Sequence, residues 1–244
     1  MLEVQAAVAK VKKYAVSESG DTVEMVERPE GGLSFVLADG QRSGRAAKMV
    51  SNIVVRKVVS LLAEGVRDGA AARAANDYLR IQRGGRVSAD MVILSVDLRT
   101  RTLVVSRNTR CPVALFIGDA FILLDEPTET LGIKRGTRPM IHEYPLQPHM
   151  SVLAFSDGLL DAGRRVGQQV PYVDLLREFH HTDGRNAQRL ADTVLAAALE
   201  LDEGRPVDDT TVLALTVYEI DHTDEVRHLH VRFPVPVVLP PTGV

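Results

Sequence analysis

Residue types that mark several classes of protein are scarce in this sequence. Among its 244 residues there is one cysteine, so no internal disulfide can form, which fits a reducing compartment. Tryptophan is absent and aromatic residues make up 5%, so few side chains can stack on bases. The 29 Lys and Arg residues face 32 Asp and Glu residues, and the net charge of -3 lacks the basic excess of a nucleic-acid-binding protein. We therefore expect no nucleic acid among its partners.

Long apolar runs are also absent. No run reaches the roughly 18 residues needed to span a bilayer, and the N-terminal MLEVQAAVAKVKK lacks the basic start and long apolar stretch of a signal peptide. These absences predict a cytoplasmic protein without membrane association. With 45% hydrophobic and 25% charged residues, the chain can bury a sizeable core without disulfides or structural metals.

The hydrophobic pattern predicts groups of strands separated by helices. Apolar or alternating segments predict strands at residues 2–9, 21–27, 33–38, 91–97, 103–106, 113–117, 121–124, 140–144, 151–155 and 211–218. Helical spacing predicts helices at residues 43–62, with Ser43 as N-cap, and at 70–81, 172–180 and 186–201. A further helix is expected to follow Gly158.

Most breaks between predicted strands are short, which favours antiparallel neighbours because a parallel crossover needs about a dozen residues. Strands 140–144 and 151–155 are expected to pair, and the turn at residues 108–112 is expected to join neighbouring strands. The two groups of helices would cover the outer faces of two sheets. The predicted fold class is α+β: a four-layer α-β-β-α sandwich of two antiparallel sheets packed face to face.

The chain is expected to form one domain over residues 1–220, followed by a C-terminal extension over residues 221–244. The extension holds a predicted strand at residues 228–233 and a proline-rich end, and it could pack as an added strand or mediate dimerisation. Only 20 residues precede Asp21, too few for a sensory module, so a stand-alone domain is expected.

Aspartates stand at the ends of four predicted strands, next to turns. They are Asp21 after Gly20, Asp39 before Gly40, Asp157 before Gly158, and the pair Asp208 and Asp209. A single such residue is typical of a turn or a helix N-cap. Several carboxylates brought together would repel one another unless a cation neutralised them. Since oxygen ligands select Mg²⁺ or Mn²⁺ over Zn²⁺, a divalent metal site is expected if the fold gathers these acids.

Histidine and cysteine offer no competing cluster. We interpret His180 and His181 as an exposed pair on a charged segment, and Cys111 as an inert, partly buried thiol. His142 and His149 receive no role from the sequence.

The order of the acids, together with two motifs, resembles the metal-dependent protein phosphatase family (PPM, or protein phosphatase 2C-like), in its bacterial SpoIIE-like branch. The motifs are Phe155-Ser156-Asp157-Gly158-Leu159 and Asp208-Asp209-Thr210-Thr211-Val212, and the spacing matches from Asp21 to Leu215. Two shorter elements agree. Residues 108–112 resemble an altered form of the branch's Asn-Ala-Gly-His-x-Pro turn, and Leu131-Gly132-Ile133 resembles its Leu-Gly-Ile element.

The resemblance implies an activity and assigns roles. Phosphoserine or phosphothreonine in a protein would be hydrolysed by a water activated between two Mn²⁺ or Mg²⁺ ions, with Asp39, Asp157 and Asp208 as catalytic residues. Asp39 would bridge the ions, and the Gly40 carbonyl would bind one of them. Asp21 would hold one ion, largely through water, and Asp157 and Asp208 the other. Asp209 would have a supporting or structural role.

By analogy with the branch, the phosphorylated partner would be a STAS-type anti-sigma-factor antagonist or a stressosome protein, in bacterial partner-switching or stress signalling. The oligomeric state is left open.

The sequence departs from the branch after the first Asp-Gly. Many members continue with Met-Gly-x-Gly, whereas this chain has Gln41, Arg42, Ser43 and Gly44. Gln41 and Arg42 either shape the substrate entrance or perturb the site. Arg42 and Arg45, near a helix start, could meet a phosphate, or they could belong to a solvated basic turn.

Two features of relatives have no counterpart here. The position of a third-metal acid falls at residues 107–109, which contain none, and no arginine matches the phosphate-binding arginine that precedes the first metal acid in eukaryotic relatives.

Two alternatives remain open. A catalytically weak or inactive phosphatase-fold module could bind a phosphorylated regulatory partner. A haloacid-dehalogenase-like phosphatase or a receiver domain would instead require a parallel sheet and other acidic motifs near the first strands, and neither motif is present there.

Overall fold

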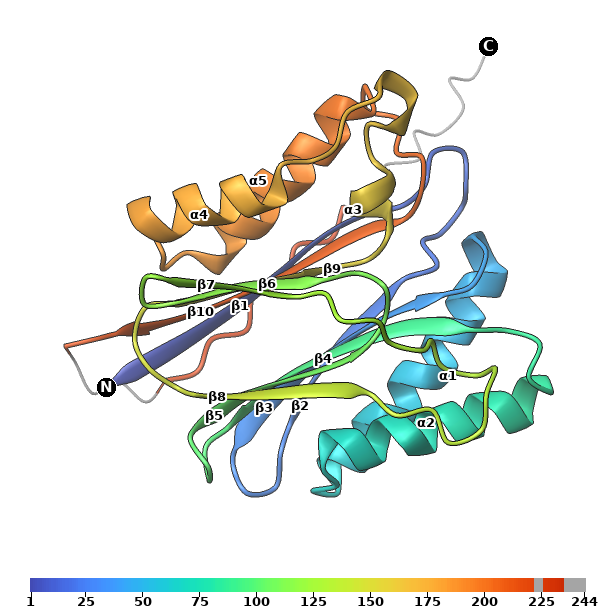
Figure 1. The fold of residues 1–244 in the computed structure, drawn as a ribbon, viewed down its shortest axis with the longest axis horizontal. Coiled ribbons are helices and arrows are strands. Elements are labelled where there is room, and N and C mark those ends of the chain that lie inside the picture. The colour runs from blue at the N-terminus through green and yellow to red at the C-terminus, as the bar shows by residue number, and fades with distance from the viewer. Residues whose placement is uncertain (222–225, 235–244) are drawn as a thin grey trace, which may run out of the picture.

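Two five-stranded antiparallel sheets stack on each other in the computed structural model, which describes residues 1–221 and 226–234 (Figure 1). The first sheet has the order β1-β10-β9-β6-β7, with strands Leu2–Val11, Thr210–Glu219, Met150–Phe155, Val113–Ile117 and Ala120–Leu124. The second has the order β2-β3-β4-β5-β8, with strands Thr22–Glu27, Gly32–Gly40, Ala89–Asp97, Thr102–Asn108 and Met140–Pro145.

Helices cover both outer faces, so the predicted four-layer α-β-β-α sandwich is confirmed (Figure 1). Helices α1 (Gly44–Ala63) and α2 (Asp68–Arg83) pack on the second sheet. Helices α3 (Gly158–Asp161), α4 (Tyr172–Thr182) and α5 (Ala187–Leu201) lie over the first sheet. Ser43 takes the N-cap position of α1, but its side chain makes no capping hydrogen bond.

Strand β10 shows how the sequence builds the layers. Its side chains alternate between the two faces of the sheet, as in any strand. Leu213, Leu215 and Val217 belong to the core between the two sheets. Val212 and Ala214 belong to the core beneath the helices of the first sheet. A continuous apolar run is therefore needed, because both faces of the strand are covered.

The predicted pairing of strands 140–144 and 151–155 is wrong. Strand β8 pairs with β5 in the second sheet, whereas β9 pairs with β10 and β6 in the first. The turn at residues 108–112 likewise leads from β5 in one sheet to β6 in the other. A short connection crosses between two stacked sheets as easily as it joins two strands of one sheet, and turn length does not separate these cases.

His180 is not the exposed residue that the sequence suggested. Its ring stacks on Phe116, with centroids 4.7 Å apart, and its nitrogens form 2.8 Å hydrogen bonds with the Ser151 hydroxyl and the Gly118 carbonyl. Burial lowers the pKa of His180 below its ordinary value of 6.5. Cys111 is fully buried, and burial raises the pKa of its thiol.

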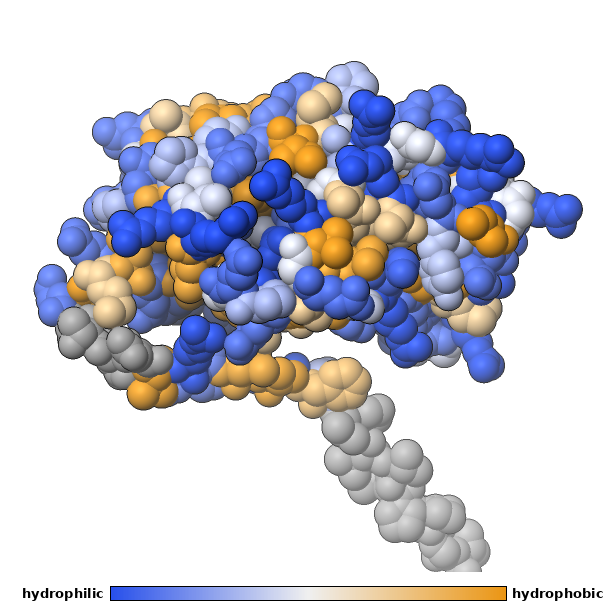
Figure 2. All heavy atoms as spheres, turned by 90° about the horizontal axis from the view of Figure 1, so that it is seen from below, coloured by the Kyte–Doolittle hydropathy of each residue, from blue (hydrophilic) through white to orange (hydrophobic). Residues whose placement is uncertain are grey.

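The predicted strand at residues 228–233 is not formed. Within the described part of the chain, residues 226–234 form no strand, and Leu229, Val231 and Phe233 are exposed. Figure 2 shows hydrophobic residues along the segment that runs beneath the body of the molecule. Alternation of apolar and polar residues forms a strand only where a sheet edge pairs with it and covers its apolar face. Residues 222–225 and 235–244 of the expected extension lie outside the described residues. Within residues 1–221 and 226–234, none of the helices has the length and apolar character of a membrane span.

Candidate functional site

A polar cavity of about 410 Å³ opens where the two sheets bring several strand ends together. The end of β3, the start of β4, and the segments after β9 and before β10 all contribute to it. Four aspartates line the cavity together with three cationic and several uncharged residues. The lining comprises Lys13, Asp39, Gly40, Gln41, Arg42, Ser43, Ser88, Ala89, Asp90, Arg110, Thr130, Asp157 and Asp208.

Asp39 and Asp157 form the centre of this cavity. They are 118 positions apart in the sequence, yet their carboxyl groups are hydrogen-bonded to each other. Burial raises the pKa of Asp39 to about 10, and the charges of Asp21, Asp157 and Asp90 add to this rise. Burial also raises the pKa of Asp157. In the absence of a cation, the pair therefore retains a proton at neutral pH.

Asp21 lies behind the cavity rather than in its wall. Its Oδ2 accepts hydrogen bonds from the Ser156 and Thr211 hydroxyls at 2.8 and 2.6 Å, while its buried Oδ1 has no hydrogen-bond partner among the described residues. Burial raises its pKa to about 6. The Lys10 and Lys48 ammonium groups donate to its backbone carbonyl. The structure thus brings Asp21 close to Asp39, with one carboxylate oxygen left for a further ligand.

Asp208 and Asp209 face different surroundings although they are adjacent. Asp208 lines the cavity, and its Oδ1 lies 3.8 Å from the Lys13 ammonium. The carboxylate of Asp209 is buried and accepts 2.8 Å hydrogen bonds from the backbone N–H groups of Lys13 and Gly20. Asp209 therefore fastens the segment before β2 to the start of β10.

The glycines that follow two of the acids are required by close packing. A Cβ at Gly40 would lie 2.1 Å from the Ala47 carbonyl oxygen in α1. A Cβ at Gly158 would lie 2.2 Å from the Asp209 carbonyl oxygen. Each Asp-Gly pair thus allows the backbone beside a cavity carboxylate to touch the neighbouring element.

Asp90, the fourth acid in the wall, was not predicted from the sequence. Asp90 lies directly opposite Asp39 in the antiparallel pairing of β3 with β4, where two like charges repel. Burial raises its pKa, and the Thr109 hydroxyl donates to its Oδ2 at 2.8 Å. The predicted strand began one residue later, at Met91. Extending that strand and pairing it with residues 33–40 would have placed Asp90 beside Asp39.

Three cationic side chains line the cavity: Lys13, Arg42 and Arg110. Arg42 is exposed to solvent and has a left-handed backbone, with φ 83°. Arg45, which the sequence grouped with Arg42, is exposed and does not line the cavity. Neither His142 nor His149 contributes to the wall.

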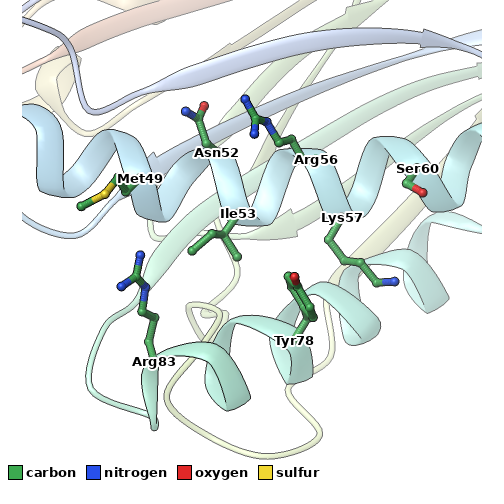
Figure 3. Close-up of a pocket in the computed structure, with 8 residues that line it drawn as sticks. All are labelled: Met49, Asn52, Ile53, Arg56, Lys57, Ser60, Tyr78 and Arg83. Carbon is green, nitrogen blue, oxygen red and sulfur yellow. The ribbon is translucent and has the colours of Figure 1, made fainter.

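A larger hollow of about 530 Å³ lies between α1 and α2 (Figure 3). Its lining includes Arg56, Lys57 and Arg83, as well as Met49, Ile53 and Tyr78, but no carboxylate. Mg²⁺ and Mn²⁺ prefer oxygen ligands with negative charge. The acid-lined cavity is therefore the better candidate for metal chemistry.

The residues of the acid-lined cavity fit a hard divalent cation. All the candidate ligands are oxygens, two carboxyls are close enough to share a proton, and one buried oxygen of Asp21 is unpartnered among the described residues. In the described part of the chain, no three His, Cys, Asp or Glu side chains are grouped tightly enough to hold one ion by themselves. Mg²⁺ commonly binds through one or two carboxylates and keeps several waters, so this grouping is compatible with it.

Known proteins with the same fold were found by comparison. The structure of the PP2C phosphatase domain and a fragment of the regulatory domain of SpoIIE from Bacillus subtilis has a TM-score of 0.73 and 20% identity, covering 89% of this chain and 64% of that one. The RsbU and RsbW domains of Rv1364c from Mycobacterium tuberculosis give 0.72 and 20%, covering 88% and 61%. At these identities the similarity establishes a shared PP2C fold.

Two further structures with this fold contain metal ions. The catalytic domain of the phosphatase PstP, in complex with two manganese ions, has a TM-score of 0.66 and 16% identity and covers 90% of this chain and all of that one. RsbX in complex with magnesium has a TM-score of 0.68 and 16% identity, with coverages of 89% and 100%.

Sequence comparison gives the family. Stage II sporulation protein E of Bacillus subtilis (strain 168) is 20% identical over 204 residues, which are 84% of this chain but 24% of that protein, so the chain spans about a quarter of its relative's length. The family described as Stage II sporulation protein E (SpoIIE) matches residues 29–218, which include Asp39, Asp90, Asp157 and Asp208. The resemblance noted in the sequence is therefore confirmed, and the chain belongs to the SpoIIE family.

Proposed function

We propose that this chain is a metal-dependent protein serine/threonine phosphatase. The observation that carries the proposal is the hydrogen-bonded carboxyl pair of Asp39 and Asp157 in an acid-lined cavity. Such a pair is costly without a cation, because burial and mutual repulsion both disfavour the charged carboxylates. Membership of the SpoIIE family and the PP2C fold support this activity.

Asp39, Asp157 and Asp208 would hold Mn²⁺ or Mg²⁺, with the Gly40 carbonyl and Asp21 as further ligands. Two bound cations would lower the pKa of a water and neutralise the charge of the phosphoryl oxygens. The chain's own residues supply the rest. Ser156 and Thr211 fix the Asp21 carboxylate, and Asp209 holds the adjoining backbone in place.

The substrate would be a phosphoserine or phosphothreonine on a protein. The cavity is polar and lined by cationic side chains as well as acids. The acids would hold metal ions, and these ions and the cationic side chains would together neutralise a phosphate dianion. Family membership supports a phosphorylated regulatory protein as the partner, and a STAS-type antagonist or a stressosome protein is our specific proposal for it.

Hydrolysis of p-nitrophenyl phosphate and of a phosphoserine protein tests this function. We expect turnover with Mn²⁺, none in EDTA, and loss of turnover in Asp39→Asn and Asp157→Asn. Asp174→Asn is the control, because Asp174 lies on α4 in an exposed ion pair with Arg177. Equal activity in EDTA would reject the proposal. Mn²⁺ binding without turnover would favour a non-catalytic module that binds a phosphorylated partner.

A further inference from the structure

The three cations of the cavity differ in what already engages them. The Lys13 ammonium lies 3.8 Å from Asp208, and the Lys13 backbone N–H donates to Asp209. Arg42 and Arg110 are both exposed, and the Arg42 guanidinium, on the loop before α1, also forms no hydrogen bond or ion pair with any residue in 1–221 or 226–234. The Arg110 guanidinium forms no hydrogen bond or ion pair with any residue in 1–221 or 226–234, although it lines the wall. Arg110 is therefore free to bind a ligand.

The backbone around Arg110 is firmly held. Its own N–H donates to the Asp90 carboxylate, which also accepts the Thr109 hydroxyl at 2.8 Å. The Cys111 N–H donates to the Thr109 hydroxyl oxygen at 3.0 Å, and the Thr109 N–H donates to Thr128 at 2.8 Å. An arginine on a fixed backbone loses less entropy when it binds, because only its side chain has to be ordered.

The guanidinium lies near the acids that would hold metal. Burial raises the pKa values of Asp90 and Asp157, and the positive charge of Arg110 opposes that rise at both residues. With cations neutralising the carboxylates, Arg110 would remain as a donor beside them. A planar guanidinium matches two phosphate oxygens and forms two parallel charge-assisted hydrogen bonds.

We propose that Arg110 binds the phosphoryl group of the substrate, and that Asp90 is the positioning residue that fixes the Arg110 backbone. This proposal rests on the phosphatase function proposed above. The phosphate-binding arginine would then lie on the β5–β6 connection, between Asn108 and Val113. No arginine was predicted for this role in the segment before the first acid, Asp21.

Phosphate binding can be measured without turnover. In the experiment, inorganic phosphate is titrated into the Mn²⁺-loaded protein by calorimetry, and Mn²⁺ binding is measured separately for each variant. We expect Arg110→Ala to weaken phosphate binding roughly tenfold to a hundredfold, as for loss of charge-assisted hydrogen bonds, with Mn²⁺ affinity kept. Arg110→Lys should recover only part of the loss. Arg135→Ala is the matched control, because Arg135 is exposed and outside the cavity lining.

Steady-state kinetics give the second readout. Arg110→Ala should raise KM for p-nitrophenyl phosphate and for a phosphoserine peptide by a similar factor. Unchanged phosphate affinity and KM in Arg110→Ala would overturn the proposal. Wild-type protein that binds phosphate through Arg110 but hydrolyses nothing would leave this inference standing while rejecting the phosphatase function.

Two variants distinguish whether Asp90 positions Arg110 or binds the metal itself. Asp90→Asn keeps an oxygen that accepts from the Thr109 hydroxyl and the Arg110 N–H, whereas Asp90→Ala removes both contacts. We expect phosphate affinity near wild type in Asp90→Asn, a loss like that of Arg110→Ala in Asp90→Ala, and Mn²⁺ affinity kept in both. Equal loss of Mn²⁺ affinity in both variants, with phosphate binding otherwise unchanged, would overturn the positioning role.

Discussion

Asp39→Asn should make the metal-free protein more stable while removing its function. In the folded chain, burial and neighbouring acids raise the pKa of Asp39 from 3.8 to about 10. The folded state then binds more protons than the unfolded state between these two values. Stability is therefore lost as pH rises through this window. The amide that Asp39→Asn introduces carries no charge and can donate to Asp157, as the protonated carboxyl does.

The size of the effect follows from linkage. At pH 8 the full shift would correspond to roughly 6 kcal/mol of lost stability. The side chain of Asp39 is partly exposed to water, and screening reduces this to about 3 kcal/mol. For a chain of this length, that corresponds to a rise in Tm of about 6–12 °C for the variant in EDTA. At pH 5 the difference should be much smaller.

The assay is thermal unfolding of wild type and Asp39→Asn in EDTA and in Mn²⁺, at pH 5 and pH 8. Asp97→Asn is the control, and its effect on the Tm at pH 8 should have the opposite sign. Burial would raise the pKa of Asp97, but hydrogen bonds from the Thr100 and Arg99 N–H groups lower it overall, so the charged carboxylate stabilises the fold. Mn²⁺ should raise the Tm of the wild type and leave that of Asp39→Asn nearly unchanged. A lower Tm for Asp39→Asn than for wild type at pH 8 in EDTA would show that burial of the Asp39 carboxyl does not destabilise the metal-free protein.

Three further predictions concern the surroundings of the site. Gly158→Ala should lower the free energy of unfolding by about 2 kcal/mol or more in a urea titration and weaken Mn²⁺ binding, because its Cβ would overlap the Asp209 carbonyl; unchanged stability would contradict this packing. For His180, the lowered pKa means that stability is lost as pH falls below 6.5, so the Tm advantage of wild type over His180→Gln should shrink between pH 8 and pH 5; a constant difference would count against it. Ser156→Ala removes one of the two hydroxyls that hold Asp21, and calorimetry should show weaker Mn²⁺ binding; unaltered affinity would argue against a role for Asp21 at the metal.

The fold class could be predicted because its signals are local. Segments such as β10 are apolar throughout, and helices such as α1 carry an apolar face, so element type follows from a few neighbouring residues. Pairing was harder. The short turns before β6 and β9 cross between sheets, and nothing within a turn records which sheet the next strand joins. The strand predicted at residues 228–233 was wrong because an alternating pattern forms a strand only when another strand pairs with it. Such pairing depends on distant parts of the chain, and the local pattern does not contain it.

Some residues of the candidate site could be predicted from local motifs, whereas others are placed there by long-range strand pairing. Asp39 and Asp157 stand in motifs whose residues are adjacent in sequence, and the structure brings their carboxyls together. Asp90 and Arg110 enter the cavity through the pairing of β3, β4 and β5, a long-range feature. Arg45 is only three positions from Arg42, but Arg42 lies on the loop before α1 with φ 83°, whereas Arg45 is in the first turn of α1 and does not line the cavity.

A crystal structure of the protein soaked in Mn²⁺, with anomalous scattering to locate the metal, would show whether the acid-lined cavity binds the cation. We expect anomalous density in the cavity beside Asp39, Asp157 and Asp208, together with loss of the direct hydrogen bond between the Asp39 and Asp157 carboxyls. An unchanged carboxyl pair and no anomalous density in the cavity at saturating Mn²⁺ would contradict it.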